Sequence, residues 1–133
     1  MNFETFFGFT KIIVDDLDRI AVFYEQTMGF RQFQRVHSSV AGEPMEEIIL
    51  GAGMGQSVPV VVWKWPNRPA PAASDVILGF QTKDVAALVA KVVAAGGSVV
   101  EAPREDPEHG VRVAFTKDPD GRLMELVDLL GGS

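Results

Sequence analysis

The sequence contains no cysteine, which excludes disulfide frameworks, thiolate metal sites and cysteine nucleophiles. Histidine is also scarce, because only His37 and His109 occur in 133 residues. We expect both in surface loops, and the acidic residues near His109 do not form a recognisable ligand spacing with it. The chain has 12 basic and 18 acidic residues, a net charge of -6, and this balance argues against nucleic acid as a partner.

Long apolar runs are absent as well. No stretch approaches the roughly 20 residues of a membrane span, and the first residues lack the basic and apolar regions of a secretory signal. We therefore expect a cytoplasmic protein with no membrane partner. What the sequence does contain is 47% hydrophobic residues, enough for one compact domain with a real core.

The first half of the chain alternates strand and helix signals. A helix is predicted over residues 17–28, because Asp16 is a good N-cap, apolar side chains recur at helical spacing and Gly29 is typical of a helix end. Four strands are predicted around it, at 9–14, 30–36, 46–50 and 58–65. Residues 37–44 are expected to form a loop, and residues 51–57 a turn.

The second half repeats this order after a proline-rich stretch. Asp84 follows Asp16 by 68 positions, and Gly97 follows Gly29 by the same interval. Strands are predicted at 76–82, 98–102, 111–116 and 123–129, with a helix between the first two. We therefore expect an α+β fold in one domain, 1–133, with a first βαβββ module at 6–66, a linker at 67–75 and a second βαβββ module at 76–130.

The final hairpin carries one carboxylate among apolar neighbours. Asp118-Pro119-Asp120-Gly121 is a strong turn signal. In the strand that follows, Glu125 alternates with buried-type residues and shares a face with Leu123 and Val127. An unpaired carboxylate in apolar surroundings is costly, so Glu125 is expected to face a cavity or to have a partner.

These residues resemble a known family. A strand followed by VDDLDRIAVFYEQTMGF, then KDVAALVAKVVAAGG, then VRVAFTKDPDGRLMEL is similar to the vicinal oxygen chelate superfamily, which includes glyoxalase I, extradiol dioxygenases and bleomycin-resistance-type binding proteins. The resemblance implies two modules paired around a concave cavity, and a homodimer. In its metal-dependent members, a side chain from the first strand and a Glu from the last strand of each module bind one divalent ion.

Only one of the four metal positions that the resemblance implies holds a donor. Glu125 matches the last-strand Glu of the second module, whereas the first-strand positions fall on Phe9 and Ile77 and the remaining one falls near Val61. One carboxylate does not provide the several N or O ligands that a divalent ion needs. We therefore predict no metal and no other cofactor.

Several side chains are candidates for contacting a ligand. Lys11 shares a predicted strand face with Phe9, so it either projects into the cavity and pairs with Glu125 or is a solvated edge lysine. Trp63 and Trp65 alternate along one strand, where they stack on a flat ligand or pack in a core or dimer interface. Gln81 lies on the face of Ile77 and is either a hydrogen-bond donor to the ligand or an exposed glutamine.

Three functions fit these features. The first is metal-independent binding of a small apolar or aromatic molecule, including sequestration of a toxic compound. The second is a lyase or isomerase with Glu125 as general base, or a glyoxalase-like metalloenzyme with unexpected ligands. The third is an interaction module whose cavity is filled by its own aromatic residues. The ligand itself is not identifiable from the sequence.

Overall fold

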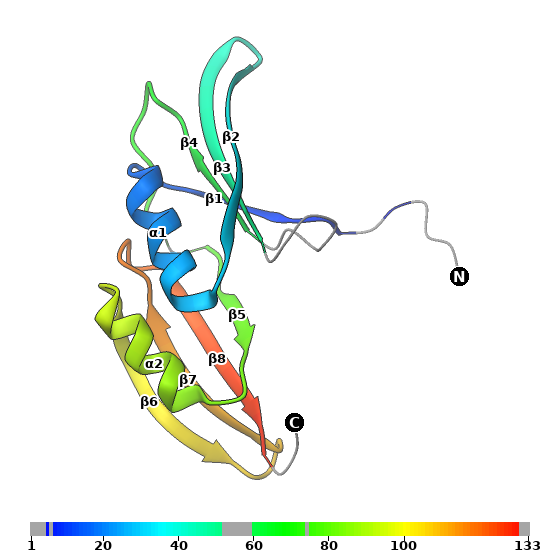
Figure 1. Cartoon of the computed structure of the whole chain (residues 1–133), viewed down its shortest axis with the longest axis vertical. Helices are drawn as coiled ribbons and strands as arrows, with labels where there is room; N and C mark the ends of the chain where they lie inside the picture. Colours follow the sequence, from blue (N-terminus) through cyan, green and yellow to red (C-terminus); the bar gives the residue numbers. More distant parts are fainter. Residues whose placement is uncertain (1–4, 6, 52–59, 74, 131–133) are drawn as a thin grey trace. The chain divides into compact units, whose positions relative to one another are not determined.

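The computed structural model describes residues 5, 7–51, 60–73 and 75–130. Val58 and Pro59, which were predicted to begin the fourth strand, and all of the predicted 51–57 turn except Gly51 lie outside the described residues. The elements follow the expected strand and helix order (Figure 1): β1 (Thr10–Ile13), α1 (Leu17–Met28), β2 (Arg31–Val40), β3 (Glu43–Gly51), β4 (Val60–Lys64), β5 (Leu78–Gln81), α2 (Val85–Ala94), β6 (Ser98–Asp106), β7 (Val111–Lys117) and β8 (Leu123–Leu129).

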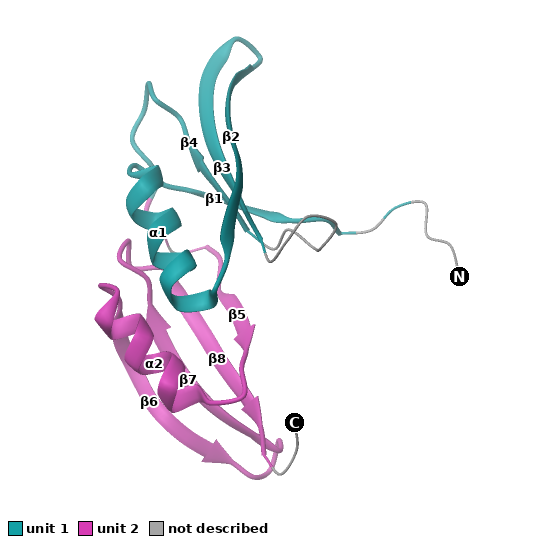
Figure 2. Cartoon of the chain, viewed as in Figure 1, with its two compact units in different colours: residues 1–71 teal, residues 72–133 magenta. Residues whose placement is uncertain are grey.

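The chain divides into two compact units, residues 1–71 and residues 72–133 (Figure 2). The described residues of each unit form one helix and one four-stranded sheet, with strand order β1-β4-β3-β2 in the first and β5-β8-β7-β6 in the second. In both sheets the first and last strands of the unit are parallel neighbours, and the other pairs are antiparallel. The expected α+β fold of two βαβββ modules is confirmed.

The two helices begin in the same way, as the 68-residue repeat predicts. The Asp16 side chain accepts a hydrogen bond from the Arg19 N–H at 3.1 Å, and the Asp84 side chain accepts one from the Ala87 N–H at 3.0 Å. Each bond satisfies a backbone donor that the first helical turn leaves free. In α1, Gly29 ends the helix in a left-handed conformation at φ +72°, as glycine does most easily.

The end of α2 is built differently from the end of α1. Gly96, not Gly97, has the left-handed conformation, at φ +103°. Gly97 is required for a different reason, because a Cβ there would lie 2.5 Å from the Lys117 carbonyl oxygen and 2.6 Å from Val92 Cγ1. Gly96 is therefore needed for its backbone conformation and Gly97 for the space around it. Gly29 is needed for its backbone conformation alone.

One face of each sheet is covered by the helix of its own unit. In the first unit, Ile12, Ile48 and Val62 lie side by side across three strands and are at most 3% exposed. In the second, the Asp128 carboxylate accepts a hydrogen bond from the Val85 N–H at 3.0 Å, which places Asp128 and its alternate neighbours Leu126 and Met124 on the α2 side. The intervening residues lie on the opposite faces.

The predicted loop at 37–44 is wrong, because β2 and β3 form one long hairpin across this region (Figure 1). Ala41 and Gly42 make a two-residue turn with φ values of +50° and +85°, the geometry that suits the twist of paired strands. Consequently His37 lies in a strand, where its Nδ1 is 3.0 Å from Glu46 Oε1. The edge strand β2 is exposed on both faces, so its polar residues lack the alternation that normally marks a strand.

Two other strand boundaries differ from the prediction. Strand β6 continues past Ala102 and through Pro103 to Asp106, and its register with β7 shifts between Glu101 and Arg104. Proline is tolerated at such an irregularity of an edge strand. Strand β4 ends at Lys64, so Trp65 lies just beyond it.

Neither described helix is long and apolar enough to cross a membrane.

Candidate functional site

The strand registers identify the metal positions that the family resemblance implies. Lys11 pairs with Val61 in the first unit, and Gly79 pairs with Glu125 in the second. Because β1 and β5 are equivalent strands, Val61 is the counterpart of Glu125. Phe9 and Ile77 are likewise counterparts, because each comes immediately before the first paired residue of its strand, Thr10 or Leu78. Their exposed fractions are 51% and 59%.

These residues do not fit a divalent metal ion. The side chains of Phe9, Val61 and Ile77 carry no nitrogen, oxygen or sulfur atom, so only the Glu125 carboxylate could coordinate. Zinc sites in proteins have at least three such ligands, and Ca²⁺ sites have more. The donor chemistry at the four positions therefore disagrees with the metal site of the metal-dependent family members.

Lys11 has a partner that the sequence analysis did not identify. Its Nζ lies 2.9 Å from Glu47 Oε1, and the side chains of Lys11 and Glu47 are 36% and 12% exposed. Both residues lie on the sheet face turned away from α1, together with Trp63, whose ring centroid is 4.4 Å from Lys11 Nζ. We call Lys11, Glu47 and Trp63 the lysine cluster. The only sequence signal for Glu47 was its alternation along β3, and the pairing needs a strand register that the sequence does not give.

Aromatic rings extend the lysine cluster in two directions. On one side, the Phe9 ring centroid lies 5.4 Å from Lys11 Nζ, within the range of cation–π attraction. On the other side, Trp63 and Trp65 meet edge to face at 5.1 Å, and the Arg68 guanidinium lies 4.3 Å from the Trp65 centroid. Both predicted tryptophans thus lie next to each other, with cations at both ends of the pair.

Arg68 anchors the outer end of this row. It donates hydrogen bonds to both carboxylate oxygens of Glu43, at 2.7 Å and 3.3 Å. A bidentate pair fixes the guanidinium plane, and Trp65 is held beneath it. These contacts form a row within the first unit in which two neighbouring rings lie between two ion pairs: Glu43, Arg68, Trp65, Trp63, Lys11 and Glu47.

Glu125 lies on the face of its sheet turned away from α2. It is half-buried, and the structure gives its carboxylate no hydrogen-bond or ion-pair partner among the described residues of the second unit. Gly79, directly beside it on β5, has open space where a Cβ would be. The carboxylate thus has an uncovered flank, and the expected Lys11–Glu125 pair remains a prediction.

A shallow depression of about 310 Å³ lies at the same edge of the second unit. Gln81 lines it and is exposed, and a hydrogen bond from Gln81 to a ligand stays a prediction. Its other lining residues are mostly apolar: Gly79, Phe80, Val127 and Leu129.

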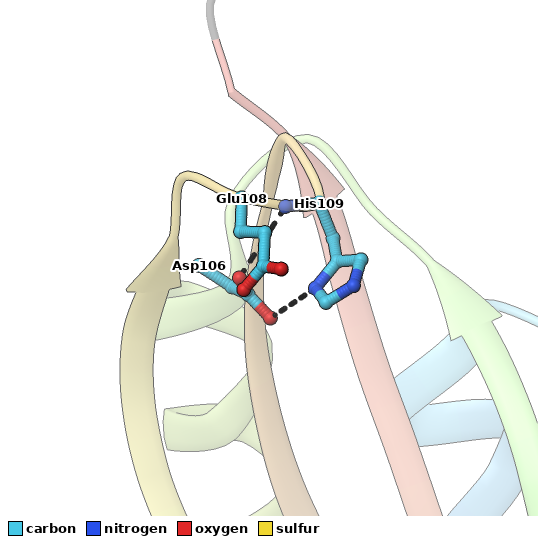
Figure 3. A group of neighbouring side chains, drawn as sticks. All are labelled: Asp106, Glu108 and His109. Atoms are coloured by element: carbon cyan, nitrogen blue, oxygen red, sulfur yellow. Dashed lines mark hydrogen bonds and ion pairs between the residues drawn. The ribbon is translucent and has the colours of Figure 1, made fainter.

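A second group of polar side chains lies at the turn between β6 and β7. Asp106, Glu108 and His109 have potential ligand atoms within 4.8 Å of one another (Figure 3), although their spacing did not suggest a site. His109 Nδ1 is already 2.9 Å from Asp106 Oδ2, and this hydrogen bond lowers the pKa of Asp106 from its ordinary value. Glu108 and His109 are exposed, so the group is explained as a turn held by its own hydrogen bonds.

Comparison with known proteins gives a consistent family. A model described as the Glyoxalase/Bleomycin resistance protein/Dioxygenase superfamily matches residues 7–126. A lactoylglutathione lyase of Arabidopsis thaliana is 33% identical over 119 residues, which are 86% of this chain and 41% of the plant protein. A probable lactoylglutathione lyase of Vibrio cholerae is 26% identical over 121 residues, 89% of this chain and 86% of that protein.

Solved structures have the same fold. A glyoxalase family protein from Bacillus cereus has a TM-score of 0.81 at 19% identity, covering 98% of this chain and 97% of its own. Glyoxalase I from Zea mays has a TM-score of 0.71 at 21% identity and covers 92% of this chain and 46% of its own. The chain thus spans less than half the length of its plant relatives.

Proposed function

Because the chain belongs to the glyoxalase/bleomycin resistance protein/dioxygenase superfamily, we propose that it is a metal-independent member that binds a small apolar or aromatic molecule. The observation that carries the proposal is the lysine cluster with its flanking rings. Exposed Phe9 and half-buried Trp65 offer aromatic surface near one partly exposed ammonium group, and the buried Trp63 ring contacts both that ammonium group and Trp65. The metal positions, by contrast, offer a single donor, so the reaction chemistry of metal-dependent relatives has no support here.

Rings arranged in this way suit a flat ligand. A half-exposed Phe9 side chain can cover one side of a ring, and aromatic pairs in offset or edge-to-face geometry add to the free energy of area burial. Lys11, with its side chain 36% exposed, supplies a polar contact that orients the ligand. A few polar groups within an apolar lining are typical of small-molecule sites.

The test combines metal analysis with a binding screen. The purified protein should contain far less than one divalent ion per chain by elemental analysis. Aromatic and thiol-conjugate compounds should be screened by thermal shift, since a ligand that binds the native state raises the apparent melting temperature. A tightly held ion that is lost in Glu125→Gln would contradict metal independence. A screen with no hits would contradict the binding role.

A second candidate function is a lyase or isomerase with Glu125 as general base. Two observations favour it: the carboxylate has an uncovered flank beside Gly79, and relatives with matching sequence are named lactoylglutathione lyases. A general base must lie within hydrogen-bond reach of the substrate proton that it removes, and an uncovered carboxylate leaves room for a substrate there. Formation of lactoylglutathione by the purified chain, abolished in Glu125→Gln and retained in the control Glu108→Gln, would establish this function. Stoichiometric binding without product would exclude it.

A further inference from the structure

The lysine cluster contains a buried donor without an acceptor. Trp63 is 9% exposed, and no hydrogen-bond partner of its indole Nε1 lies among the residues that the structure describes. Only one other buried side-chain atom in the described ranges, the Thr116 hydroxyl oxygen, shares this condition. Leaving a buried N–H unpaired is unfavourable, and buried tryptophans usually find a partner for it. The indole N–H therefore lacks an acceptor, and because the atom is buried, a ligand oxygen reaches it only by displacing the groups that cover it.

Lys11 provides further donors next to it. An ammonium group has three N–H bonds, and one of them is directed to Glu47 at 2.9 Å. The other close neighbours are ring faces, which attract the cation without accepting a conventional hydrogen bond. Two N–H bonds thus remain on a side chain that is 36% exposed, whereas the Glu47 side chain is only 12% exposed. A ligand reaching the cluster meets donors rather than acceptors.

We infer that the ligand is a small aromatic carboxylate. Its carboxylate accepts hydrogen bonds from Lys11 and from the Trp63 indole, and its ring packs against Phe9. A carboxylate has two oxygens and about four lone-pair sites, so it can accept from both donors. The inference rests on the proposed binding function and specifies the chemical class that the site recognises.

Glu47 sets the strength of this recognition. Its carboxylate competes with the ligand for the same ammonium group, because Glu47 Oε1 lies 2.9 Å from Lys11 Nζ. Removing that charge while keeping the shape should free the ammonium for the ligand. This gives the inference a variant that gains affinity, which general damage to the fold would not produce.

The experiment is isothermal titration of the full chain with matched probes. Naphthalene-2-carboxylate should bind at least about tenfold more tightly than naphthalene-2-carboxamide, a difference equivalent to about 1.4 kcal/mol. Equal affinity for the two probes would overturn the inference and leave the binding function standing. Failure of both probes, with no hit in the wider screen, would instead contradict the binding function.

Four variants then assign the preference to residues. In Glu47→Gln, carboxylate affinity should rise at least about threefold with carboxamide affinity unchanged. In the double variant Lys11→Met, Glu47→Gln, which leaves no unpaired charge, the carboxylate preference should disappear. Trp63→Phe should lower the affinity for both probes, because each probe carries an oxygen that accepts a hydrogen bond from the indole N–H. Lys64→Met, which removes a positive charge on the α1 side of the sheet, should preserve the preference.

Two results with these variants would count against the assignment. A carboxylate preference that survives in the double variant would show that Lys11 does not select the charge. Carboxylate affinity that rises in Glu47→Gln and falls by the same factor in the control Lys64→Met would show that the response follows overall charge and not the lysine cluster.

Discussion

Val61 and Glu125 occupy the same place in their units. In the parallel strand pairs, Val61 lies beside Lys11 and Glu125 lies beside Gly79. The two units therefore differ in a complementary way at this level. The first has a cation on its first strand and an apolar residue on its last, and the second has a glycine and an anion. A repeated framework thus carries different chemistry on its two copies.

The Lys11–Glu47 pair should contribute to stability through the burial of its anion. Lys11→Met leaves Glu47 uncompensated, and we expect a loss of about 1–2 kcal/mol, less than for a fully buried pair because solvent reaches the ammonium. The neutral double variant Lys11→Met, Glu47→Gln should recover most of this loss. Urea denaturation of the parent protein, the single variants Lys11→Met and Glu47→Gln, and the double variant measures the coupling. Additive effects of the two substitutions would contradict the pairing.

Asp128 should stabilise α2 from the last strand. Its buried carboxylate accepts the Val85 N–H at 3.0 Å and lies 3.5 Å from Arg112 Nη1. Asp128→Ala leaves that N–H unpaired and should lower the free energy of unfolding by about 1–3 kcal/mol. Asp128→Asn keeps an acceptor and should cost less. Equal losses for the two variants, measured by thermal or urea unfolding, would show that the side chain acts only by packing.

Gly97→Ala should be one of the most damaging small substitutions in the second unit. The added methyl group would collide with the Lys117 carbonyl oxygen at 2.5 Å, and relief requires α2 and β7 to separate. We expect a loss of at least about 2 kcal/mol. Gly79→Ala is the matched control, because nothing lies within 4 Å of its added Cβ. Similar stability of both variants would contradict the close approach.

Asp106 should titrate below the ordinary range of an aspartate. The hydrogen bond from His109 lowers its pKa, so the stabilisation is present above the unfolded-state value of about 3.9 and is lost as pH falls through the lower folded-state pKa. NMR titration of the carboxyl carbon measures this. His109→Ala should return the pKa toward its ordinary value, whereas Glu108→Gln should change it little. An unshifted Asp106 in the parent protein would refute the contact.

The parts of the fold that the sequence predicted well are those with local signals at both ends. Helix α1 matches its predicted bounds because Asp16 and Gly29 mark its ends and its apolar spacing is regular. Strand β8 matches because the turn before it is fixed by Asp118, which accepts hydrogen bonds from the backbone of Asp120 and Arg122. The β2–β3 hairpin was missed because the Ala41–Gly42 turn lacks the usual Asn-Gly signal.

The candidate site was predictable only in part. The sequence pattern placed Phe9 and Lys11 on one predicted strand and the two tryptophans on another. The structure brings the two pairs into contact. Glu47 was missed because its contact with Lys11 joins strands that are not neighbours in the sheet, and sequence alternation does not fix such a register. The homodimer, the cytoplasmic location and the absence of a metal stay predictions.

The parallel pairing of first and last strands has a consequence for synthesis on the ribosome. In each sheet the last strand lies between the first strand and the third, as in the order β1-β4-β3-β2. A nascent chain that has emerged only as far as β3 therefore holds a helix, a hairpin and a detached strand, with unpaired backbone edges where β4 belongs. Each half of the polypeptide can complete its sheet only when its final strand leaves the exit tunnel, so pauses just before β4 or β8 are the moments of greatest exposure to misassociation.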